Sequence, residues 1–318
     1  MKLAGRTVLV TGGAGFIGSH LVDALLDRGC RVRILDDLSN GRKANISSAL
    51  QHGAEFLQGS VEDSDIVAQA MRDVSVVFHE AALNLVLSTQ DPRRDASVNI
   101  SGTLNILETA RAMGTTDAIV HASTGSVYGE PIVQPQSENH PLNPCSPYGV
   151  SKLAAEKYVL LWQKLYQVNT IALRYYNIFG PRKNYHEEHG CVVSIFVKRA
   201  LEGKPLIIHD DGMQERHFTY VTDVVRANIL AAETPSAYGD VYNIGTVEKI
   251  TIRELARQVN EICGSHIPPV FGPRRLGDIK SMSPDLQKAQ AALGYRSTVP
   301  IRTGIELLRE WMRAELKL

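Results

Sequence analysis

The feature that most constrains the fold is a glycine-rich turn between an apolar run and a helical pattern near the N-terminus. The run TVLV (7–10) is short and mostly β-branched, which predicts a buried strand. TGGAGFIG follows at once, and FIGSHLVDALLDRG then has helical periodicity that ends at Gly29, a C-terminal cap signal. A strand, a glycine turn and a helix in this order predict the first unit of a Rossmann-type, doubly wound parallel sheet.

The glycines of this turn have the spacing of a dinucleotide-binding loop. Gly13, Gly15 and Gly18 fit GxGxxG, and Gly12, Gly15 and Gly18 fit GxxGxxG. Glycine is needed there because the backbone turns tightly, approaches a diphosphate closely and packs a helix against a strand. The free N–H groups of the first helical turn then point at the anion. A glycine-rich turn without a ligand is the alternative, but the flanking strand and helix favour a nucleotide.

An acidic residue ends the second predicted strand, where a ribose would lie. The run RVRIL (31–35) is followed by Asp36, about 20 residues after the glycine turn. A carboxylate at that place hydrogen-bonds ribose hydroxyls and repels a 2′-phosphate. The sequence therefore predicts NAD as the cofactor rather than NADP.

Strands and helices alternate along the first half of the chain and then give way to a less regular region. Further strand-like runs are VSVVFH (74–79), AIVHAS (118–123) and TIALRYYN (170–177), with helical patterns over 98–114 and 148–165. This alternation predicts a parallel sheet with helices on both faces. The segments 219–233 and 241–245 look like a return to this sheet. We expect an NAD-binding domain over 1–176 with about 219–245, and a smaller α/β substrate-binding lobe over about 177–218 and 246–318.

Composition argues against several kinds of partner. Lys and Arg together number 34, as do Asp and Glu, so no charge excess points to nucleic acid or an acidic membrane. The 318 residues contain no apolar stretch near the length of a membrane span and no signal-peptide pattern. The four cysteines are far apart and form no CxxC pair, which favours reduced thiols in the cytoplasm. The stretch HEEH (186–189) lacks the HExxH spacing, so no metal is expected.

The stretch SPYGVSK (146–152) places a tyrosine and a lysine four residues apart. Ser146 can cap a helix whose first residue is Pro147, which puts Tyr148 in the first turn, near the positive end of the helix dipole. Lys152 lies on the same helix face. Two positive influences on one phenol predict a pKa below the usual value of about 10, as a general base requires. A solvated surface pair is the alternative for this motif taken alone.

Thr124 follows a predicted strand, 24 residues before Tyr148. Together with the glycine turn, Asp36 and the Tyr148-x-x-x-Lys152 pair, it makes the sequence resemble the extended short-chain dehydrogenase/reductase family. Within that family the chain is most similar to the NAD-dependent epimerases and dehydratases that act on nucleotide-sugars. The resemblance covers nearly the whole chain and includes TGGAGFIGSHL, DDLSNG, HEAA, VYG, SPYGVSK, RYYNIFGPR, FTYVTDVV, NIG and GDI.

The resemblance implies roles for three catalytic residues. Thr124 and Tyr148 are expected to bind the 4-hydroxyl of the sugar. Lys152 is expected to bind the nicotinamide ribose and to lower the pKa of the tyrosine. Tyr148 then takes a proton while NAD takes the hydride.

The resemblance also implies contacts to both ligands. Asn177 matches a residue at the substrate diphosphate, and Arg216 and Arg275 match arginines that hold phosphates, a task that suits the planar guanidinium fork. Met282 stands where the 4-epimerases often carry Tyr, Cys or Ser beside the sugar. Asn99 matches an asparagine that supports the active-site helix from behind. The expected cofactor contacts are Gly12, Gly15, Phe16, Ile17, Gly18, Asp36, Asn40, Val61, Ala81, Ala82, Asn99, Tyr148 and Lys152.

Three positions depart from the family pattern. Ser60-Val61 replaces an aspartate followed by an aliphatic residue at the adenine contact, so adenine recognition by that side chain is open. His217 stands in RHF where RDF is commoner, and its role is open. Methionine at position 282 is flexible and intermediate in size, so it does not decide whether an N-acetyl group fits.

The residues after Thr124 separate the possible reactions. A 4,6-dehydratase carries Asp-Glu there and a UDP-glucuronate decarboxylase commonly carries Glu, whereas this chain has Gly125 and Ser126. The missing acids favour an NAD-dependent 4-epimerase that acts through a transient 4-keto sugar, with UDP-glucose, UDP-N-acetylglucosamine and UDP-glucuronate all open as substrates. A dehydratase, a decarboxylase, a keto-sugar reductase and a non-catalytic NAD-binding regulator remain alternatives. The family often dimerises through two helices, which predicts a homodimer formed partly by the helix of Tyr148.

Overall fold

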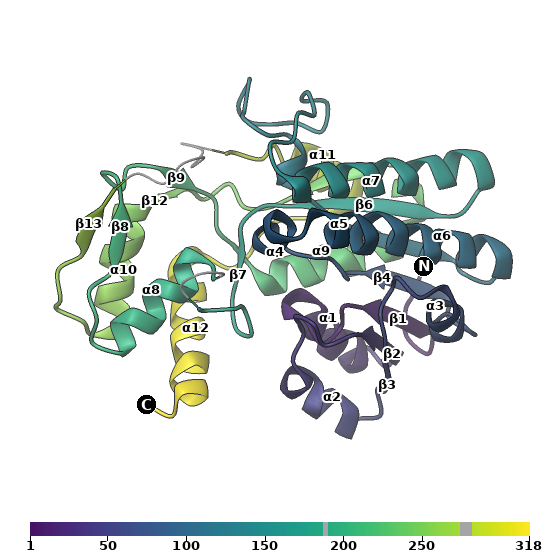
Figure 1. The fold of residues 1–318 in the computed structure, drawn as a ribbon, viewed down its shortest axis with the longest axis horizontal. Coiled ribbons are helices and arrows are strands. Elements are labelled where there is room, and N and C mark those ends of the chain that lie inside the picture. The colour runs from purple at the N-terminus through teal and green to yellow at the C-terminus, as the bar shows by residue number, and fades with distance from the viewer. Residues whose placement is uncertain (187–189, 274–281) are drawn as a thin grey trace.

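The computed structural model describes residues 1–186, 190–273 and 282–318. Its described residues form a central sheet of seven parallel strands in the order β11-β6-β5-β4-β1-β2-β3 (Figure 1). This sheet, covered by helices on both faces, confirms the predicted Rossmann-type α/β fold. Its strands are β1 (Thr7–Thr11), β2 (Arg31–Asp36), β3 (Glu55–Gln58), β4 (Val76–His79), β5 (Ala118–Thr124), β6 (Thr170–Tyr175) and β11 (Val241–Ile244).

The strand order reverses beside β1, and this reversal positions the ligand crevice. β2 pairs with one side of β1 and β4 pairs with the other, so the chain connections diverge from this point. In open parallel sheets such a point leaves a crevice outside the carboxyl ends of the strands. The glycine turn follows β1 at this edge, and Glu80, Ala81 and Ala82 follow β4.

Successive side chains of each strand point to opposite faces of the sheet, and each face has its own core. Val8 and Val10 of β1 pack in the core that contains α1 and α9, whereas Leu9 packs in the core that contains α3, α6 and α7. Burial on both faces explains why the central strands β1, β4 and β5 consist mainly of apolar residues. The helices are α1 (Phe16–Asp27), α2 (Ser47–Gln51), α3 (Ser64–Ala70), α4 (Leu85–Gln90), α5 (Pro92–Ala96), α6 (Gly102–Met113), α7 (Pro147–Tyr166) and α9 (Val221–Glu233).

Helix α7 begins as the sequence predicts. The Ser146 hydroxyl oxygen accepts the N–H of Gly149 at 3.1 Å, and Pro147 is the first helical residue. Twenty residues later the helix ends where Gln167 takes a left-handed conformation, with φ of 58°. The cap and the proline therefore fix where Tyr148 and Lys152 stand relative to the sheet.

The second part of the molecule is a small lobe of helices and short strand pairs, seen at the left of Figure 1. The helices α8, α10 and α12 pack together, β8 pairs with β13, and β9 pairs with β12. At the junction with the main sheet, β7 pairs with β10. These elements are β7 (Ile178–Phe179), α8 (Val192–Leu201), β8 (Ile207–His209), β9 (Glu215–Arg216), β10 (Thr219–Tyr220), β12 (Ile250–Thr251), α10 (Ile252–Cys263), β13 (Val270–Gly272) and α12 (Ile301–Leu316).

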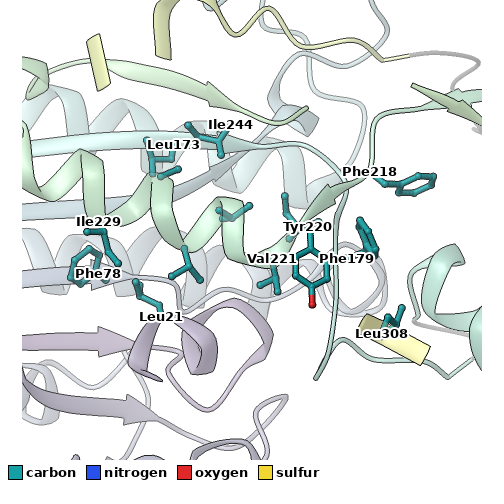
Figure 2. Close-up of a cluster of buried hydrophobic side chains, with 14 of the residues drawn as sticks. Leu21, Phe78, Leu173, Phe179, Phe218, Tyr220, Val221, Ile229, Ile244 and Leu308 are labelled. Atoms are coloured by element: carbon teal, nitrogen blue, oxygen red, sulfur yellow. The ribbon is translucent and has the colours of Figure 1, made fainter. Parts of the chain in front are cut away.

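One apolar core runs from the main sheet into the lobe. Figure 2 shows Leu173 and Ile244 of the sheet at one end and Leu308 of α12 at the other, with Phe179 and Tyr220 between them. The aromatic rings of Phe179 and Tyr220 meet edge to face, with centroids 5.5 Å apart. This continuity holds the lobe against the open end of the sheet.

The predicted elements differ from the structure at three places. β3 has no counterpart in the prediction, because its residues are half-exposed and lack a continuous apolar run. In the run 219–233, only α9 packs against the main sheet, because Thr219 and Tyr220 form β10, which pairs with β7. The helix α11 (Gln287–Leu293), in a stretch assigned to the lobe, packs against β11 and α9. No helix within the described ranges is long and apolar enough to cross a membrane.

Candidate active site

The glycine turn forms one wall of a cavity of about 220 Å³ at the point where the strand order reverses. Gly12 has a φ of 66°, and a Cβ at this position would lie 2.7 Å from the backbone nitrogen of Ala81. A side chain at Gly12 would therefore occupy the space beside the turn. Glycine leaves this space free for a diphosphate, which must approach the backbone closely. The predicted cofactor residues that line this cavity are Gly12, Gly15, Phe16, Ile17, Gly18, Asp36, Asn40, Val61, Ala81, Ala82 and Tyr148.

Asp36, the last residue of β2, lines the same cavity and accepts two backbone hydrogen bonds. One carboxylate oxygen accepts the N–H of Ala14 at 2.9 Å, and the other accepts the N–H of Leu38 at 2.8 Å. Burial raises the pKa of the Asp36 carboxyl, and these two hydrogen bonds act in the opposite direction. Asp36 thus ties the glycine turn to the next strand, and its bond to a ribose stays a prediction.

Asn99 lies behind the cavity and connects its wall to the active-site helix. Its side-chain oxygen accepts the N–H of Leu83 at 2.9 Å. Its amide nitrogen donates to Asp95 at 2.8 Å and to the Ser151 hydroxyl of α7 at 3.0 Å. This position agrees with a supporting role, and its effect on the cofactor stays a prediction.

The three predicted catalytic residues meet at the carboxyl end of β5. Tyr148 is half-buried, and its side chain hydrogen-bonds that of Thr124, the last residue of β5. The Thr124 hydroxyl oxygen also accepts the N–H of Ser126 at 3.1 Å, which fixes its rotamer. Lys152 is buried one helical turn beyond Tyr148. Burial lowers the pKa of Lys152 to about 8, although the charges of Glu80, Asp95 and Glu156 act to raise it.

The expectation that Tyr148 has a lowered pKa is wrong for the chain by itself. Burial raises the pKa of Tyr148 to about 12, and the hydrogen bond with Thr124 offsets this only in part. The carboxylates of Asp95 and Glu80 raise it further. The prediction failed because the sequence motif shows the helix and the lysine, whereas the burial and the two carboxylates come from other elements of the fold.

A second and larger cavity, of about 790 Å³, continues from this point into the lobe. Thr124 and Tyr148 line it together with Asn177 and Arg216, two of the residues predicted to hold substrate phosphates. Asn177 has a left-handed φ of 43°, and its carbonyl accepts the N–H of Thr219 at 3.1 Å. Tyr148 lines both cavities and so stands where they meet.

Two predicted substrate residues are not among the described residues that line the larger cavity. Arg275 falls outside the described residues. Met282 packs against Val127, Tyr128 and Tyr176, apart from the described residues that line the larger cavity, so its contact with a sugar stays a prediction. Of HEEH only the first histidine, at 186, lies within the described residues.

The departure at His217 has a structural explanation. Its side chain is buried, and its Nδ1 lies 3.0 Å from the carbonyl oxygen of Thr246. Burial lowers the pKa of the imidazole, so the ring is a neutral hydrogen-bond donor to that carbonyl. His217 therefore joins the segment after β9 to the loop after β11.

Glu80 is an acid of the glycine-turn cavity that the sequence patterns did not predict. The Tyr175 hydroxyl donates to the Glu80 carboxylate at 2.8 Å and lies 2.8 Å from the amide nitrogen of Asn228. Burial raises the pKa of Glu80 to about 7, while Tyr175 and the charge of Lys152 act to lower it. The available signal was a charged residue directly after a fully buried strand, in the stretch FHEAA.

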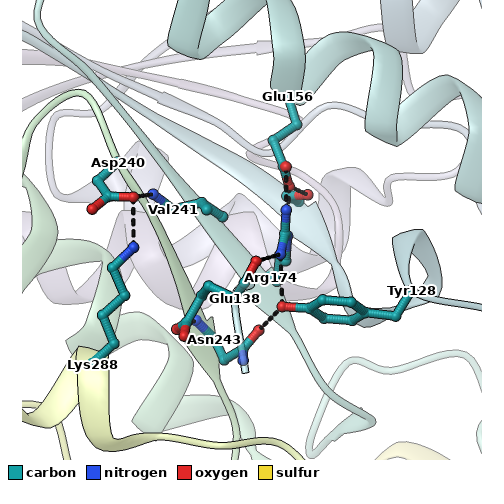
Figure 3. A network of polar contacts seen from close by, with 9 residues as sticks. Tyr128, Glu138, Glu156, Arg174, Asp240, Val241, Asn243 and Lys288 are labelled. Carbon is teal, nitrogen blue, oxygen red and sulfur yellow. Dashed lines mark hydrogen bonds and ion pairs between the residues drawn. The ribbon is translucent and has the colours of Figure 1, made fainter. Parts of the chain in front are cut away.

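The sequence patterns also did not predict the ion pair that supports the end of β5. The guanidinium of Arg174 contacts the Glu156 carboxylate at 2.5 and 2.9 Å, and both side chains are buried (Figure 3). Arg174 also donates to the Tyr128 hydroxyl at 2.6 Å, and that hydroxyl donates to Asn243 at 2.8 Å. The Ser123 hydroxyl donates to Glu156 at 2.7 Å, so the network holds the residue next to Thr124.

The parallel sheet, the glycine turn and the two cavities that meet at Tyr148 are the features of a dinucleotide-binding α/β protein, as predicted. The chain belongs to the NAD dependent epimerase/dehydratase family, whose model matches residues 8–245. This confirms the resemblance drawn from the motifs.

Three relatives match this chain over nearly their whole length. A putative UDP-glucose 4-epimerase of Methanocaldococcus jannaschii is 38% identical over 96% of this chain and 98% of its own. The structure of the Thermotoga maritima UDP-glucose 4-epimerase with UDP-glucose has a TM-score of 0.92 and 38% identity, over 98% of this chain and 99% of that one. The structure of the Bacillus cereus UDP-glucuronic acid 4-epimerase with UDP-glucuronic acid and NAD has a TM-score of 0.88 and 32% identity, over 97% and 99%.

Proposed function

We propose that this protein is an NAD-dependent 4-epimerase of a UDP-sugar, with UDP-glucose, UDP-N-acetylglucosamine or UDP-glucuronate as the substrate. The observation that carries the proposal is the position of Tyr148, which lines the glycine-turn cavity and the larger cavity and hydrogen-bonds Thr124. The phenol can then reach a sugar hydroxyl in one cavity beside a nicotinamide in the other. The relatives described above are named as 4-epimerases of UDP-sugars, one of them as putative.

The chain's own residues supply binding and proton transfer. Thr124 and Tyr148 would hold the 4-hydroxyl, and Tyr148 would take its proton and return it to the transient 4-keto sugar after the ring turns over. When bound, NAD accepts the hydride from C4 and gives it back. Because the pKa of Tyr148 is about 12 in the chain alone, a nearby positive charge is needed to make the phenol a base at neutral pH. The Lys152 ammonium is already part of the chain in which the pKa has this value, so the further positive charge would come from a bound ligand, and an oxidised nicotinamide has that sign.

The geometry after Thr124 supports epimerisation over elimination. A Cβ added at Gly125 would lie 3.0 Å from the ring of Tyr176, so this position has little room for a carboxylate. A dehydratase needs an acid and a base near the sugar C5 and C6, and Gly125-Ser126 offers neither. If the proposal fails, the alternatives are a dehydratase, a decarboxylase, a keto-sugar reductase and a non-catalytic NAD-binding regulator.

Proton NMR of the purified protein tests the function directly. The protein is mixed with each of the three UDP-sugars separately, without added NAD, and Tyr148→Phe is the control. A new anomeric signal of the 4-epimer in one tube establishes the reaction, the retained cofactor and the sugar together. No product in any tube, also after NAD is added, would contradict the proposal and favour another nucleotide-sugar reaction.

We also propose that the enzyme is a homodimer in the cytoplasm. The helix α7 exposes several large apolar side chains, which a second copy could cover: Val150, Tyr158, Leu161, Leu165 and Tyr166. The four cysteines all lie in the described residues and are free, as expected in a reducing compartment. Sedimentation equilibrium of the protein and of a Leu161→Glu variant tests the dimer, and a purely monomeric wild type would contradict it. Cell fractionation tests the location.

A further inference from the structure

A segment at the start of the lobe docks onto the helix that carries the glycine turn. The imidazole Nε2 of His20 lies 2.9 Å from the carbonyl oxygen of Pro181. Burial lowers the pKa of His20 to about 4, so at neutral pH the ring is uncharged and donates this hydrogen bond. Next to it, the Arg182 guanidinium lies 2.8 Å from the Asp23 carboxylate. Two polar contacts on successive turns of α1 therefore fix residues 181 and 182.

This docking places the next residue, Lys183, above the first turn of α1. Its ammonium lies 4.9 Å from the centroid of the Phe16 ring, and Phe16 is the first residue of the helix. The Phe16 ring is itself held edge to face against His20, with centroids 6.0 Å apart. Lys183 thus lines both the glycine-turn cavity and the larger cavity.

The charges around Lys183 leave its ammonium available for a ligand. Among the described residues it is the one cationic side chain on the glycine-turn cavity. The acids of that cavity are engaged elsewhere: Asp36 with backbone N–H groups, Asp37 with Arg94, and Glu80 with Tyr175. Burial lowers the pKa of the ammonium, and the Cys191 thiol acts to raise it. Lys183 is half-buried, and no carboxylate among the described residues pairs with its ammonium, so an anion that reaches it would replace the hydration that the ammonium has lost.

We propose that Lys183 is a diphosphate-binding residue of this enzyme, held over the glycine turn by the docking of residues 181 and 182 onto α1. The ligand chemistry is a diphosphate, because the ammonium stands above the first turn of α1, which no side chain caps, and also faces the cavity of the nucleotide-sugar. The inference takes NAD and a UDP-sugar as ligands from the proposed function, but it concerns binding and not turnover. It assigns to residue 183 a contact that sequence analysis did not predict.

Binding measurements on Lys183→Gln test this assignment. Lys43→Gln is the matched control, because Lys43 also places its ammonium over an aromatic ring, 5.9 Å from the centroid of Phe56, and lines neither cavity. NAD retained through gel filtration is measured in acid extracts, and the Kd of UDP for the purified protein is measured by calorimetry. We expect Lys183→Gln to weaken one of the two ligands by about tenfold or more, as for the loss of a charge-assisted hydrogen bond, and Lys183→Arg to restore most of it.

The two ligands distinguish the source of the diphosphate. Loss of NAD with unchanged UDP affinity assigns Lys183 to the cofactor, and the reverse assigns it to the substrate. Equal binding of both ligands by Lys183→Gln and wild type overturns the proposal. Acetylation of wild-type lysines, read by mass spectrometry, needs no variant: NAD or UDP should protect Lys183 and leave Lys43 reactive. None of these assays measures turnover, so their results can be interpreted even if the protein is not an epimerase.

Discussion

Replacing Glu80 by glutamine should change how the stability of the protein depends on pH. Glutamine keeps an oxygen that can accept the hydrogen bond of the Tyr175 hydroxyl, now 2.8 Å away, and removes only the charge. The pKa of Glu80 in the folded chain is about 7, compared with 4.5 for an unperturbed glutamate. Burial is the main cause, since a carboxylate loses hydration in the crevice.

The sign follows from proton binding in the two states. Between pH 4.5 and about 7 the folded protein keeps a proton on Glu80 that the unfolded chain releases, so the free energy of unfolding falls as pH rises through this window. At about 1.4 kcal/mol per pH unit, the full window corresponds to about 3 kcal/mol. The cavity gives water some access to Glu80, so this value is an upper bound.

Urea unfolding at pH 5, 6, 7 and 8, at equal cofactor content, measures the effect. We expect the wild type to lose up to about 3 kcal/mol relative to Glu80→Gln between pH 5 and 8, with unchanged m-values. Glu108→Gln on α6 is the control, because this glutamate is 56% exposed and lies 4.0 Å from Arg111. Parallel stability curves for wild type and Glu80→Gln would refute the reasoning.

Three further predictions concern catalysis, substrate binding and stability. Tyr148→Phe should abolish turnover and leave NAD bound, since only the hydroxyl is lost; activity in the NMR assay would remove Tyr148 as the base. Arg275→Ala should raise the KM for the nucleotide-sugar more than it lowers kcat, and an unchanged KM would separate it from the phosphates. Glu156→Gln should destabilise the fold by about 3–5 kcal/mol in urea unfolding, because Arg174 is left buried without its counter-charge. A loss below about 1 kcal/mol would show that Arg174 finds water or another partner.

The parts of the site that the sequence predicted depend on contacts between near neighbours in the chain. The glycine turn, the cap of α7 and the helical spacing of Tyr148 and Lys152 each involve a few residues, and the structure has all three. Thr124 joins them because the strand that carries it ends at the same edge of the sheet. Parallel strands bring their carboxyl ends together, so one topological rule was enough to collect these residues.

The parts that the sequence did not predict depend on pairs far apart in the chain. Glu80 and Tyr175 are 95 residues apart, and Tyr128 and Asn243 are 115 apart. Lys183 reaches the glycine turn only because two neighbouring residues dock onto α1, and no local pattern encodes that docking. Periodicity and caps indicate secondary structure, but they do not tell which polar side chains share a buried site.

The same distinction explains why the pKa of Tyr148 was predicted in the wrong direction. Around the phenol the fold places the Lys152 ammonium and the carboxylates of Glu80 and Asp95, while the nearby carboxylate of Glu156 is paired with Arg174. Burial is the main reason that the phenol keeps its proton, and with both of these acids ionised an excess of negative charge adds to this effect. A cationic ligand beside Tyr148 would balance this excess and release the proton. An oxidised nicotinamide has that charge, so we predict that the pKa of Tyr148 depends on the oxidation state of the bound cofactor.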